Sequence, residues 1–310
     1  MRPPAAITVI VPGFDVAPYA PAALTSLRAQ TRHDFIAVLV DDGSTDETGA
    51  MFDTVASEDN RFRVVHHDLR RGLSAARNTG LDLVTTPFVG FLDADDVLDP
   101  HALATLVGSL ERTGSDLAVG AYVRLRPDDA GRYVSGEVQP WVAAATDPAR
   151  QRATLESHPD VANNIVAWSK VTRAEMWRDL RFPAGKAYED QVVAQLLYTR
   201  ARAFDVVPDV VVQWRVRAEG TSITQRREAL PVLRDYLEAL AGGLAVLDAS
   251  GATAAAASRV ALMFSLDLPP LVQIARDHPD PRYRTLLGAT VRALAPRTDV
   301  PLDVRPALSW

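Results

Sequence analysis

Short apolar runs alternate with segments of helical spacing along the first 125 residues of the chain. The apolar runs predict strands at Ile7–Val11, Phe35–Val40, Phe62–His66, Pro87–Leu92 and Leu117–Leu125. The segments between them predict helices at Pro21–Gln30, Thr45–Ala56, Leu73–Leu83 and Leu103–Arg112. Strands that alternate with helices through short connections predict an α/β fold with a doubly wound, mostly parallel sheet.

The pattern loosens after Arg126. It predicts a polar turn, helix fragments with a loop, two helices and a strand, at Pro127–Gly136, Pro140–Asp160, Val161–Trp177, Tyr188–Arg200 and Val206–Val216. From Arg227 onward leucines recur at steps of three and four, a seam that packs against a partner helix. Further helices are expected over 257–266, 269–277 and 282–294. We therefore expect an α/β domain over residues 1–225 and a small helical extension over 226–310.

The composition is that of an ordinary globular protein, with 47% hydrophobic and 23% charged residues. The formal net charge of −6 argues against nucleic acid as a partner, since nucleic-acid binding usually needs a basic face. The chain has no cysteine, which excludes disulfides, thiol catalysis and cysteine-type zinc sites. No signal-peptide core or transmembrane segment is expected, so we predict a cytoplasmic protein, at most peripheral at the inner face of a membrane.

Acidic or polar clusters end three of the predicted strands, at Pro12–Asp15, Asp41–Ser44 and Asp93–Asp96. Taken alone, Asp41–Ser44 fits a turn followed by a helix cap. Parallel strands, however, place all three ends at one edge of the sheet, where α/β proteins bind ligands. The Asp93-Ala94-Asp95 sequence suits a hard divalent ion that shares oxygen ligands with phosphate groups. The pattern predicts a metal-dependent enzyme that acts on a nucleotide-activated substrate.

These elements, with others in the same order, resemble the inverting family-2 glycosyltransferases of the GT-A fold, a Rossmann-like doubly wound architecture. The matching residues are Val9–Asp15, Leu24, Ser26, Leu27, Gln30, Thr31, Val40–Asp46, Gly72–Asn78, Phe91–Asp96, Trp168–Lys170, Phe182–Pro183, Tyr188–Asp190, Trp214–Arg217 and Thr221–Thr224. The resemblance covers about residues 5–225, with a nucleotide-sugar half over about 1–100 and an acceptor half over about 101–225. Asp15 and Arg71 stand where the family often has asparagine.

The resemblance implies roles in binding the donor. The implied nucleotide-binding residues are Pro12, Asp15, Asp42, Arg77, Asp93, Arg215 and Arg217. Asp95, together with Asp93, would hold Mn²⁺ or Mg²⁺, which bridges the phosphates and neutralises the departing diphosphate. Asp96 is either a second ligand or a helix cap. Alternatively, Arg77 forms a structural ion pair with a nearby acid, and Arg215 and Arg217 are ordinary surface arginines.

The resemblance also implies residues for the acceptor. Asp190 would be the base that deprotonates the acceptor hydroxyl, and attack from the opposite face would invert the anomeric carbon. The implied acceptor-binding residues are Trp168, Lys170, Tyr188 and Glu189. Alternatively, the acids only decorate a helix N-terminus, and the aromatic residues belong to the core.

The function predicted from the sequence is a hexosyl- or N-acetylhexosaminyltransferase. Its donor would be a UDP-sugar, and its acceptor a cell-envelope glycan or polymer. One alternative is a catalytically silent sugar-nucleotide-binding or scaffold protein. Another is a phosphoacceptor signalling domain, which the only two lysines, Lys170 and Lys186, fit poorly. The helices over 226–310 are expected to form a homo-oligomer contact, an acceptor platform or part of the protein's own core.

Overall fold

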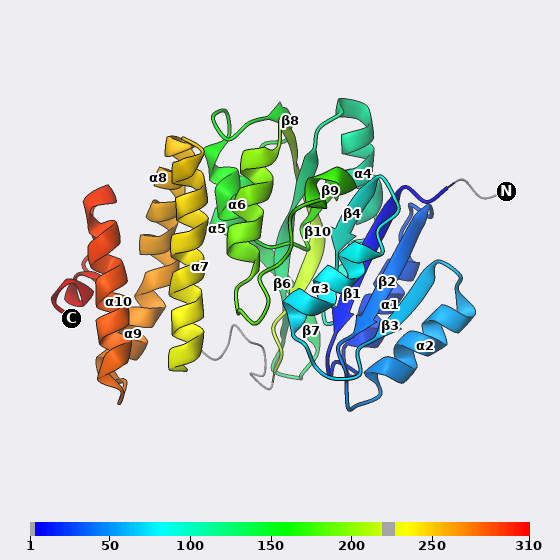
Figure 1. Cartoon of the computed structure of the whole chain (residues 1–310), viewed down its shortest axis with the longest axis horizontal. Helices are drawn as coiled ribbons and strands as arrows, with labels where there is room; N and C mark the ends of the chain where they lie inside the picture. Colours follow the sequence, from blue (N-terminus) through cyan, green and yellow to red (C-terminus); the bar gives the residue numbers. More distant parts are fainter. Residues whose placement is uncertain (1–3, 219–226) are drawn as a thin grey trace. The chain divides into compact units, whose positions relative to one another are not determined.

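The structure is a computed structural model that describes residues 4–218 and 227–310 (Figure 1). The described residues fall into two compact units. The first comprises residues 4–154, 166–186 and 200–218, and the second comprises 155–165, 187–199 and 227–310. Two short segments before residue 200 are thus grouped with the C-terminal helices. The domain boundary expected near residue 225 stays a prediction.

The first unit is built on one mixed sheet whose strand order is β3-β2-β1-β4-β9-β6-β10-β5 (Figure 1). The strands on this path are β1 (Ile7–Gly13), β2 (Phe35–Asp41), β3 (Phe62–His66), β4 (Phe88–Phe91), β5 (Val97–Leu98), β6 (Leu117–Pro127), β9 (Lys170–Arg173) and β10 (Phe204–Arg215). The longest registers, β1 with β2 and β6 with β10, are parallel. The predicted α/β fold with a mostly parallel sheet is confirmed.

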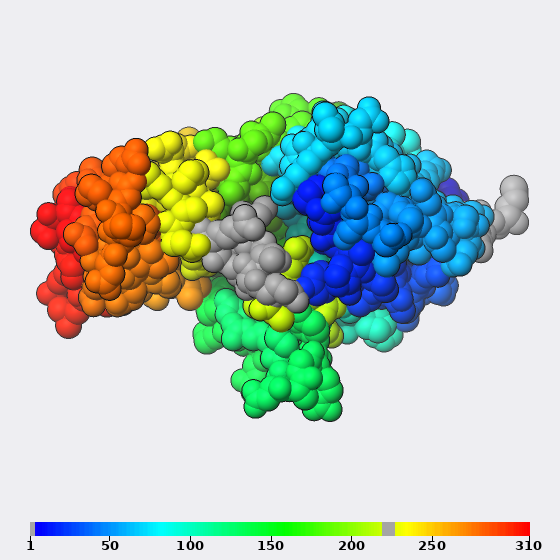
Figure 2. Space-filling model, turned by 90° about the horizontal axis from the view of Figure 1, so that it is seen from below, coloured from blue at the N-terminus to red at the C-terminus, as the bar shows by residue number. Residues whose placement is uncertain are grey.

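Two short strands pair beside this path, β7 (Tyr133–Val138) with β6 and β8 (Arg150–Ala153) with β10. The turn between β6 and β7 stands out from the surface of the first unit, green in Figure 2. The sequence predicts only a polar turn here, because most of the β7 side chains are exposed and carry no apolar periodicity.

Five α-helices belong to the first unit: α1 (Ala20–Arg28), α2 (Thr48–Glu58), α3 (Leu73–Asp82), α4 (Ala102–Thr113) and α5 (Pro140–Thr146). Helix α3 packs on β1 and β2, and α4 packs on β6 and β10. The contact of α3 depends on Gly80, where an added Cβ would lie 2.3 Å from Cγ2 of Ile10. This close approach holds the segment before α3 at the carboxyl edge of the sheet.

The helix predicted over Val161–Trp177 is wrong. The structure has two 3₁₀ turns, Pro159–Asn163 and Ala174–Trp177, with strand β9 between them. Strand β9 pairs antiparallel with β4 on one side and with β6 on the other. Its hydrogen bonds come from residues far away in the sequence, so local spacing does not reveal it.

The second unit is helical, as predicted for the C-terminal region. Its principal helices are α6 (Asp190–Arg200, apart from its last residue), α7 (Leu230–Ala249), α8 (Thr253–Leu262), α9 (Leu268–Asp277) and α10 (Pro281–Leu294), with a π-helix at Met263–Asp267. The leucine seam of α7, from Leu233 to Leu247, is buried in a core shared with α8, α9 and α10. The seam therefore packs within its own unit, as the core-packing alternative predicts.

One helical run among the described residues, Thr253–Asp277, is long and apolar enough to cross a membrane by length and composition. Its mean hydropathy is 1.3, and half of its most apolar window is buried inside the protein. Because the core helix of a soluble protein passes the same test, this run is weak support for a membrane span.

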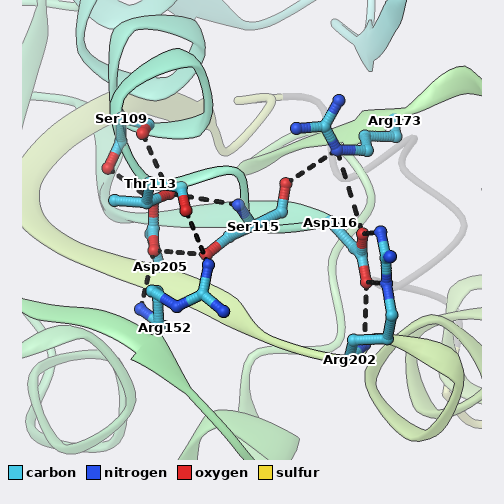
Figure 3. A network of polar contacts seen from close by, with 8 residues as sticks. All are labelled: Ser109, Thr113, Ser115, Asp116, Arg152, Arg173, Arg202 and Asp205. Carbon is cyan, nitrogen blue, oxygen red and sulfur yellow. Dashed lines mark hydrogen bonds and ion pairs between the residues drawn. The ribbon is translucent and has the colours of Figure 1, made fainter.

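A buried polar network joins the amino ends of β6 and β10 (Figure 3). The carboxylate of Asp205, fully buried, accepts hydrogen bonds from the hydroxyls of Ser109, Thr113 and Ser115 and from the backbone N–H of Arg152. Beside it, Asp116 pairs with Arg202 and Arg173. This network fixes α4 and β8 to the sheet edge opposite the strand ends that carry the acidic motifs.

Candidate functional site

The carboxyl ends of β1, β2 and β4 lie side by side in the first unit. The carbonyl of Gly13 accepts a hydrogen bond from the Asp42 N–H at 2.8 Å. The carbonyl of Pro12 accepts one from the Ala94 N–H at 3.3 Å. The segments that follow β2 and β4 therefore flank the end of β1, and the three polar clusters share one edge of the sheet.

Asp15 locks the loop after β1 to the loop after β2. Its Oδ1 accepts a hydrogen bond from the Thr45 N–H at 2.8 Å, and its own N–H donates to the Ser44 hydroxyl at 3.1 Å. Its φ of 47° lies in the left-handed region, which aspartate and asparagine enter more readily than most residues. This conformation accounts for an aspartate where the resembling family often has asparagine.

Asp42 is buried beneath the loop between β3 and α3. Its Oδ1 lies 2.7 Å from Nδ1 of His67 and accepts from the Arg71 N–H, and its Oδ2 accepts from the Gly72 N–H at 2.7 Å. A carboxylate offers roughly four lone-pair sites, so three contacts leave about one for a ligand N–H. The contact of Asp42 with a nucleobase stays a prediction.

Arg77, on α3, is almost fully buried and pairs with Asp93 of the acidic motif Asp93–Asp96. Its Nη2 donates to Oδ1 of Asp93 at 2.8 Å, and its guanidinium lies 5.1 Å from the centre of the Phe182 ring. The ion pair with a nearby acid that the sequence left open as an alternative is present. Arg77 thereby fixes Asp93, whether or not it also contacts a nucleotide.

The end of β10 brings two arginines onto Asp95 and Asp96. Nε and Nη2 of Arg217 lie 2.8 and 2.7 Å from Oδ2 of Asp95. Arg215 donates from Nε to the Asp95 carbonyl and from its backbone N–H to Oδ1 of Asp96, both at 2.7 Å. The alternative that these are ordinary surface arginines is wrong, because Arg215 is buried and both engage the acidic motif.

Burial and mutual repulsion disfavour the charged forms of Asp95 and Asp96. Burial raises the pKa of Asp95, with a further rise from Asp93 that the opposing effect of Arg217 does not cancel. Burial, then Asp95 and Asp93, raise the pKa of Asp96 well above its usual range. Oδ2 of Asp96 is buried without a hydrogen-bond partner. A cation bound at this motif would relieve both conditions.

The described residues contain no group of three or more His, Cys, Asp or Glu side chains placed to hold a metal ion. Mg²⁺ and related ions are often held by only one or two carboxylates, with substrate phosphates completing the shell. Asp95 and Asp93 fit that kind of site. Since Oδ2 of Asp95 is paired with Arg217, an ion at this oxygen would require the ion pair to open.

Two tyrosines that no sequence motif marks flank the arginines. The guanidinium of Arg215 lies 4.3 Å from the ring centre of Tyr133 and 5.6 Å from that of Tyr19. The guanidinium of Arg217 lies 5.3 Å from the ring centre of Tyr19. Tyr133 stands on β7 and Tyr19 at the start of α1, so only the folded chain brings them to β10.

Two of the predicted acceptor-binding residues lie buried in the first unit. Trp168 packs between Tyr122 and Trp214, with ring centres 4.8 and 6.3 Å away. Lys170 is also buried, and its Nζ donates to the carbonyl of Val166 at 2.5 Å. Their role stays a prediction.

The predicted base and its neighbours belong to the second unit. Asp190 is the first residue of α6 and is half-buried, and Glu189 before it is buried. Tyr188 has a φ of 59°, and its ring centre lies 4.3 Å from that of Tyr236. The role of Asp190 as the base stays a prediction. The matching segment Thr221–Thr224 lies outside the described residues.

Comparisons with known proteins agree with this arrangement. The family model for glycosyl transferase family 2 matches residues 8–165. Glycosyltransferase GlyG of Streptococcus pneumoniae serotype 4 is 25% identical over 234 residues, which are 75% of this chain and 77% of GlyG. Glycosyltransferase GlyA of the same organism is 30% identical over 218 residues, 70% of this chain, but the chain spans only 31% of GlyA.

Solved structures share the fold. Residues 1–349 of S. aureus TarS, in complex with UDP-GlcNAc, superpose with a TM-score of 0.75 at 20% identity, covering 97% of this chain and 83% of that one. The mannosyltransferase PcManGT of Pyrobaculum calidifontis, in complex with GDP-Man and Mn²⁺, gives a TM-score of 0.54 at 22% identity, covering 95% and 87%. With the family match and the acidic motifs at one sheet edge, these likenesses establish that the chain belongs to glycosyl transferase family 2 and is a glycosyltransferase.

Proposed function

We propose that this glycosyltransferase is inverting and metal-dependent, and that it moves a sugar from a UDP-sugar to an acceptor hydroxyl on a cell-envelope glycan or polymer. The observation that carries the proposal is the acidic motif itself. Asp93, Asp95 and Asp96 stand together at the carboxyl edge of the sheet with raised pKa values for the last two, beside Arg215 and Arg217. Such a site suits a diphosphate together with a cation.

Asp95 and Asp93 would hold the Mn²⁺ or Mg²⁺. When bound, a divalent ion supplies positive charge that stabilises the leaving diphosphate. Support comes from the fold relative PcManGT, whose complex contains Mn²⁺. Arg217, once separated from Asp95, and Arg215 would bind the phosphate oxygens, since a guanidinium matches phosphate geometry.

The nucleoside would lie at the ends of β1 and β2. Pro12 and Asp15 would line the base pocket, and Asp42 would accept a hydrogen bond from an N–H of the base. Support for uracil comes from TarS, which binds UDP-GlcNAc, whereas PcManGT binds GDP-Man. Both nucleotides therefore belong in the test. Arg77 would act through Asp93, which it holds in place.

Asp190 would accept the proton of the acceptor hydroxyl. The acceptor oxygen then forms a bond to the anomeric carbon as the bond from that carbon to the phosphate oxygen breaks, and attack from the opposite face inverts the configuration. Glu189 and Tyr188 would orient the acceptor, and Trp168 and Lys170 would support the acceptor half from within the core. We place the enzyme in the cytoplasm, at most peripheral at the inner face of the membrane.

The test is nucleoside diphosphate release from a panel of UDP- and GDP-sugars, with Mn²⁺, Mg²⁺ or EDTA. The wild type is compared with Asp190→Asn and with Asp209→Asn, a matched change at an exposed aspartate on β10. We expect metal-dependent release from a UDP-sugar that Asp190→Asn abolishes and Asp209→Asn leaves intact. UDP binding without turnover in any variant would instead support a catalytically silent binder.

A further inference from the structure

A buried ion pair in the second unit contacts the helix turn that carries the proposed base. Nη2 of Arg259, on α8, lies 2.8 Å from Oδ2 of Asp267 and 3.3 Å from Oε1 of Gln191. Arg259 is only 3% exposed, and Gln191, which directly follows Asp190, is 4% exposed. Burying the Arg259 charge this deeply, against a partly buried Asp267, costs desolvation energy, so its presence calls for an explanation beyond stability.

A contact between two tilted tyrosine rings, of Tyr236 and Tyr188, reaches the residue just before Glu189 and Asp190. Tyr236, on α7, is buried, and its ring centre lies 4.3 Å from that of Tyr188. Burial, and then the Asp267 carboxylate next to it, raise the pKa of the Tyr236 hydroxyl well above its usual range. Tyr188 is held at a φ of 59°, a left-handed conformation that is strained for a residue of this size. Strained backbone of this kind persists where its surroundings fix it.

Helix α7 also contacts the backbone of this segment directly. A Cβ added at Gly243 would lie 3.2 Å from the Gln191 carbonyl oxygen, and one at Gly242 would lie 2.9 Å from Cγ2 of Val192. Ahead of the acids, the Ala187 N–H donates to Oδ2 of Asp235, also on α7, at 3.1 Å. The segment from Ala187 to Val192 is thus held at both ends by one helix.

The geometry of the ion pair depends on an irregular helix. Arg259 and Asp267 are eight residues apart, a rise of about 12 Å along a regular α-helix. Between them the chain forms the π-helix Met263–Asp267, a rare feature that is often found at functional sites. The wider turn brings the Asp267 carboxylate next to both the Arg259 guanidinium and the Tyr236 hydroxyl.

We propose that Arg259, with Asp267 and Tyr236, is a positioning residue that sets the backbone of Tyr188–Gln191 and thereby the carboxylate of Asp190. The C-terminal helices then act in sugar transfer by holding the base, although none of these three residues needs to touch substrate. This inference rests on the proposed function, because it takes Asp190 as the base.

The test compares Arg259→Gln and Arg259→Lys with Arg297→Gln, which breaks the more exposed Arg297–Asp248 ion pair of the same unit. Each full-length variant is assayed for kcat, for KM of the donor, for UDP affinity and for thermal unfolding. Hydrogen exchange of the amides over residues 187–195 is measured alongside. The experiment separates loss of base position from loss of fold.

We expect Arg259→Gln to lower kcat about 10- to 100-fold, as a displacement of the base by about 1 Å does, with donor KM and UDP affinity within about twofold. Its amides over 187–195 should exchange faster. Arg259→Lys should recover part of kcat, and Arg297→Gln should match the wild type. A purely structural role would instead reduce activity only in proportion to the unfolded fraction.

A folded Arg259→Gln with wild-type kcat overturns the inference. If this variant does not fold, Tyr236→Phe decides, because it keeps the ring and removes only the hydroxyl. A several-fold loss of kcat supports the inference, and unchanged kcat refutes it. Asp190→Asn distinguishes the two levels of failure, because an active Asp190→Asn overturns the proposed base itself. An inactive Asp190→Asn beside a fully active Arg259→Gln overturns only the positioning role.

Discussion

Replacement of Asp205 by alanine tests the network at the amino ends of β6 and β10. The carboxylate of Asp205 accepts four hydrogen bonds of 2.6 to 2.9 Å while fully buried. Removing it leaves the hydroxyls of Ser109 and Ser115 and the N–H of Arg152 without this acceptor. Thr113 loses less, since its hydroxyl also donates to the Ser109 carbonyl.

The expected loss follows from these contacts. A buried donor left unpaired costs about 1–3 kcal/mol, and three donors are affected. Removing the buried charge recovers part of the desolvation energy. We therefore expect Asp205→Ala to lower the free energy of unfolding by about 3–5 kcal/mol. Asp205→Asn should cost less, because the amide keeps an acceptor oxygen and the hydroxyls can turn to accept from its NH₂ group.

Urea unfolding followed by tryptophan fluorescence measures this loss in the relevant unit. Four of the five tryptophans, Trp141, Trp168, Trp177 and Trp214, belong to the first unit. Asp209→Ala, an exposed aspartate on the same strand, is the control and should stay within about 0.5 kcal/mol of the wild type. An Asp205→Ala midpoint that matches this control would show that the hydrogen bonds of Asp205 add nothing to stability.

Three further predictions concern the site and its support. Asp95→Asn should weaken Mn²⁺-dependent UDP binding at least about tenfold, as measured by calorimetry. Arg217→Ala should bind Mn²⁺ more tightly than the wild type when no nucleotide is present. Equal Mn²⁺ affinities would contradict competition between Arg217 and the ion for Asp95. Hydrogen bonds to Asp41 and then Asp53 raise the pKa of His66. The contribution of His66 to the free energy of unfolding is therefore complete below about pH 6.5 and is lost as the pH rises through the raised pKa. Burial alone would raise the pKa of Asp41, but hydrogen bonds from Ser44 and His66 lower it. The contribution of Asp41 to the free energy of unfolding is therefore lost only as the pH falls below about 3.8. His66→Ala should therefore destabilise the protein more at about pH 5.5 than at about pH 8.5, and an equal loss at both would show that the ion pair contributes nothing. Gly80→Ala should lower the free energy of unfolding by about 1–3 kcal/mol, because the added Cβ meets the Ile10 side chain. Gly108→Ala on α4 is the control. Its Cβ meets only the end of the Arg112 side chain, so this change should be neutral or stabilising.

The sequence revealed the features that depend on local pattern. The strands ending at Gly13 and Asp41 are apolar runs followed directly by polar clusters, so both the strands and the common edge of their acids could be predicted. The leucine seam of α7 likewise repeats within one helix. The family was recognisable because its motifs keep their order along the chain.

Features that depend on pairing between distant segments could not be predicted. Strand β9 is defined by its neighbours β4 and β6 rather than by its own four residues. The pairing of Asp95 with Arg217 spans 122 residues. Trp168 matched a family motif, yet its burial against Tyr122 and Trp214 emerges only from the folded sheet. The sequence indicates which residues are candidates for the site, but not which side chains each of them contacts.

A crystal structure of the full chain with UDP and Mn²⁺, with the ion located by its anomalous signal, tests directly whether the acidic motif holds the metal. We predict Mn²⁺ within about 2.0–2.6 Å of an Asp95 carboxylate oxygen, a diphosphate beside Arg215, and Arg217 released from Asp95. UDP bound elsewhere, or an Asp95 that remains paired with Arg217 beside a metal-free diphosphate, would contradict this prediction.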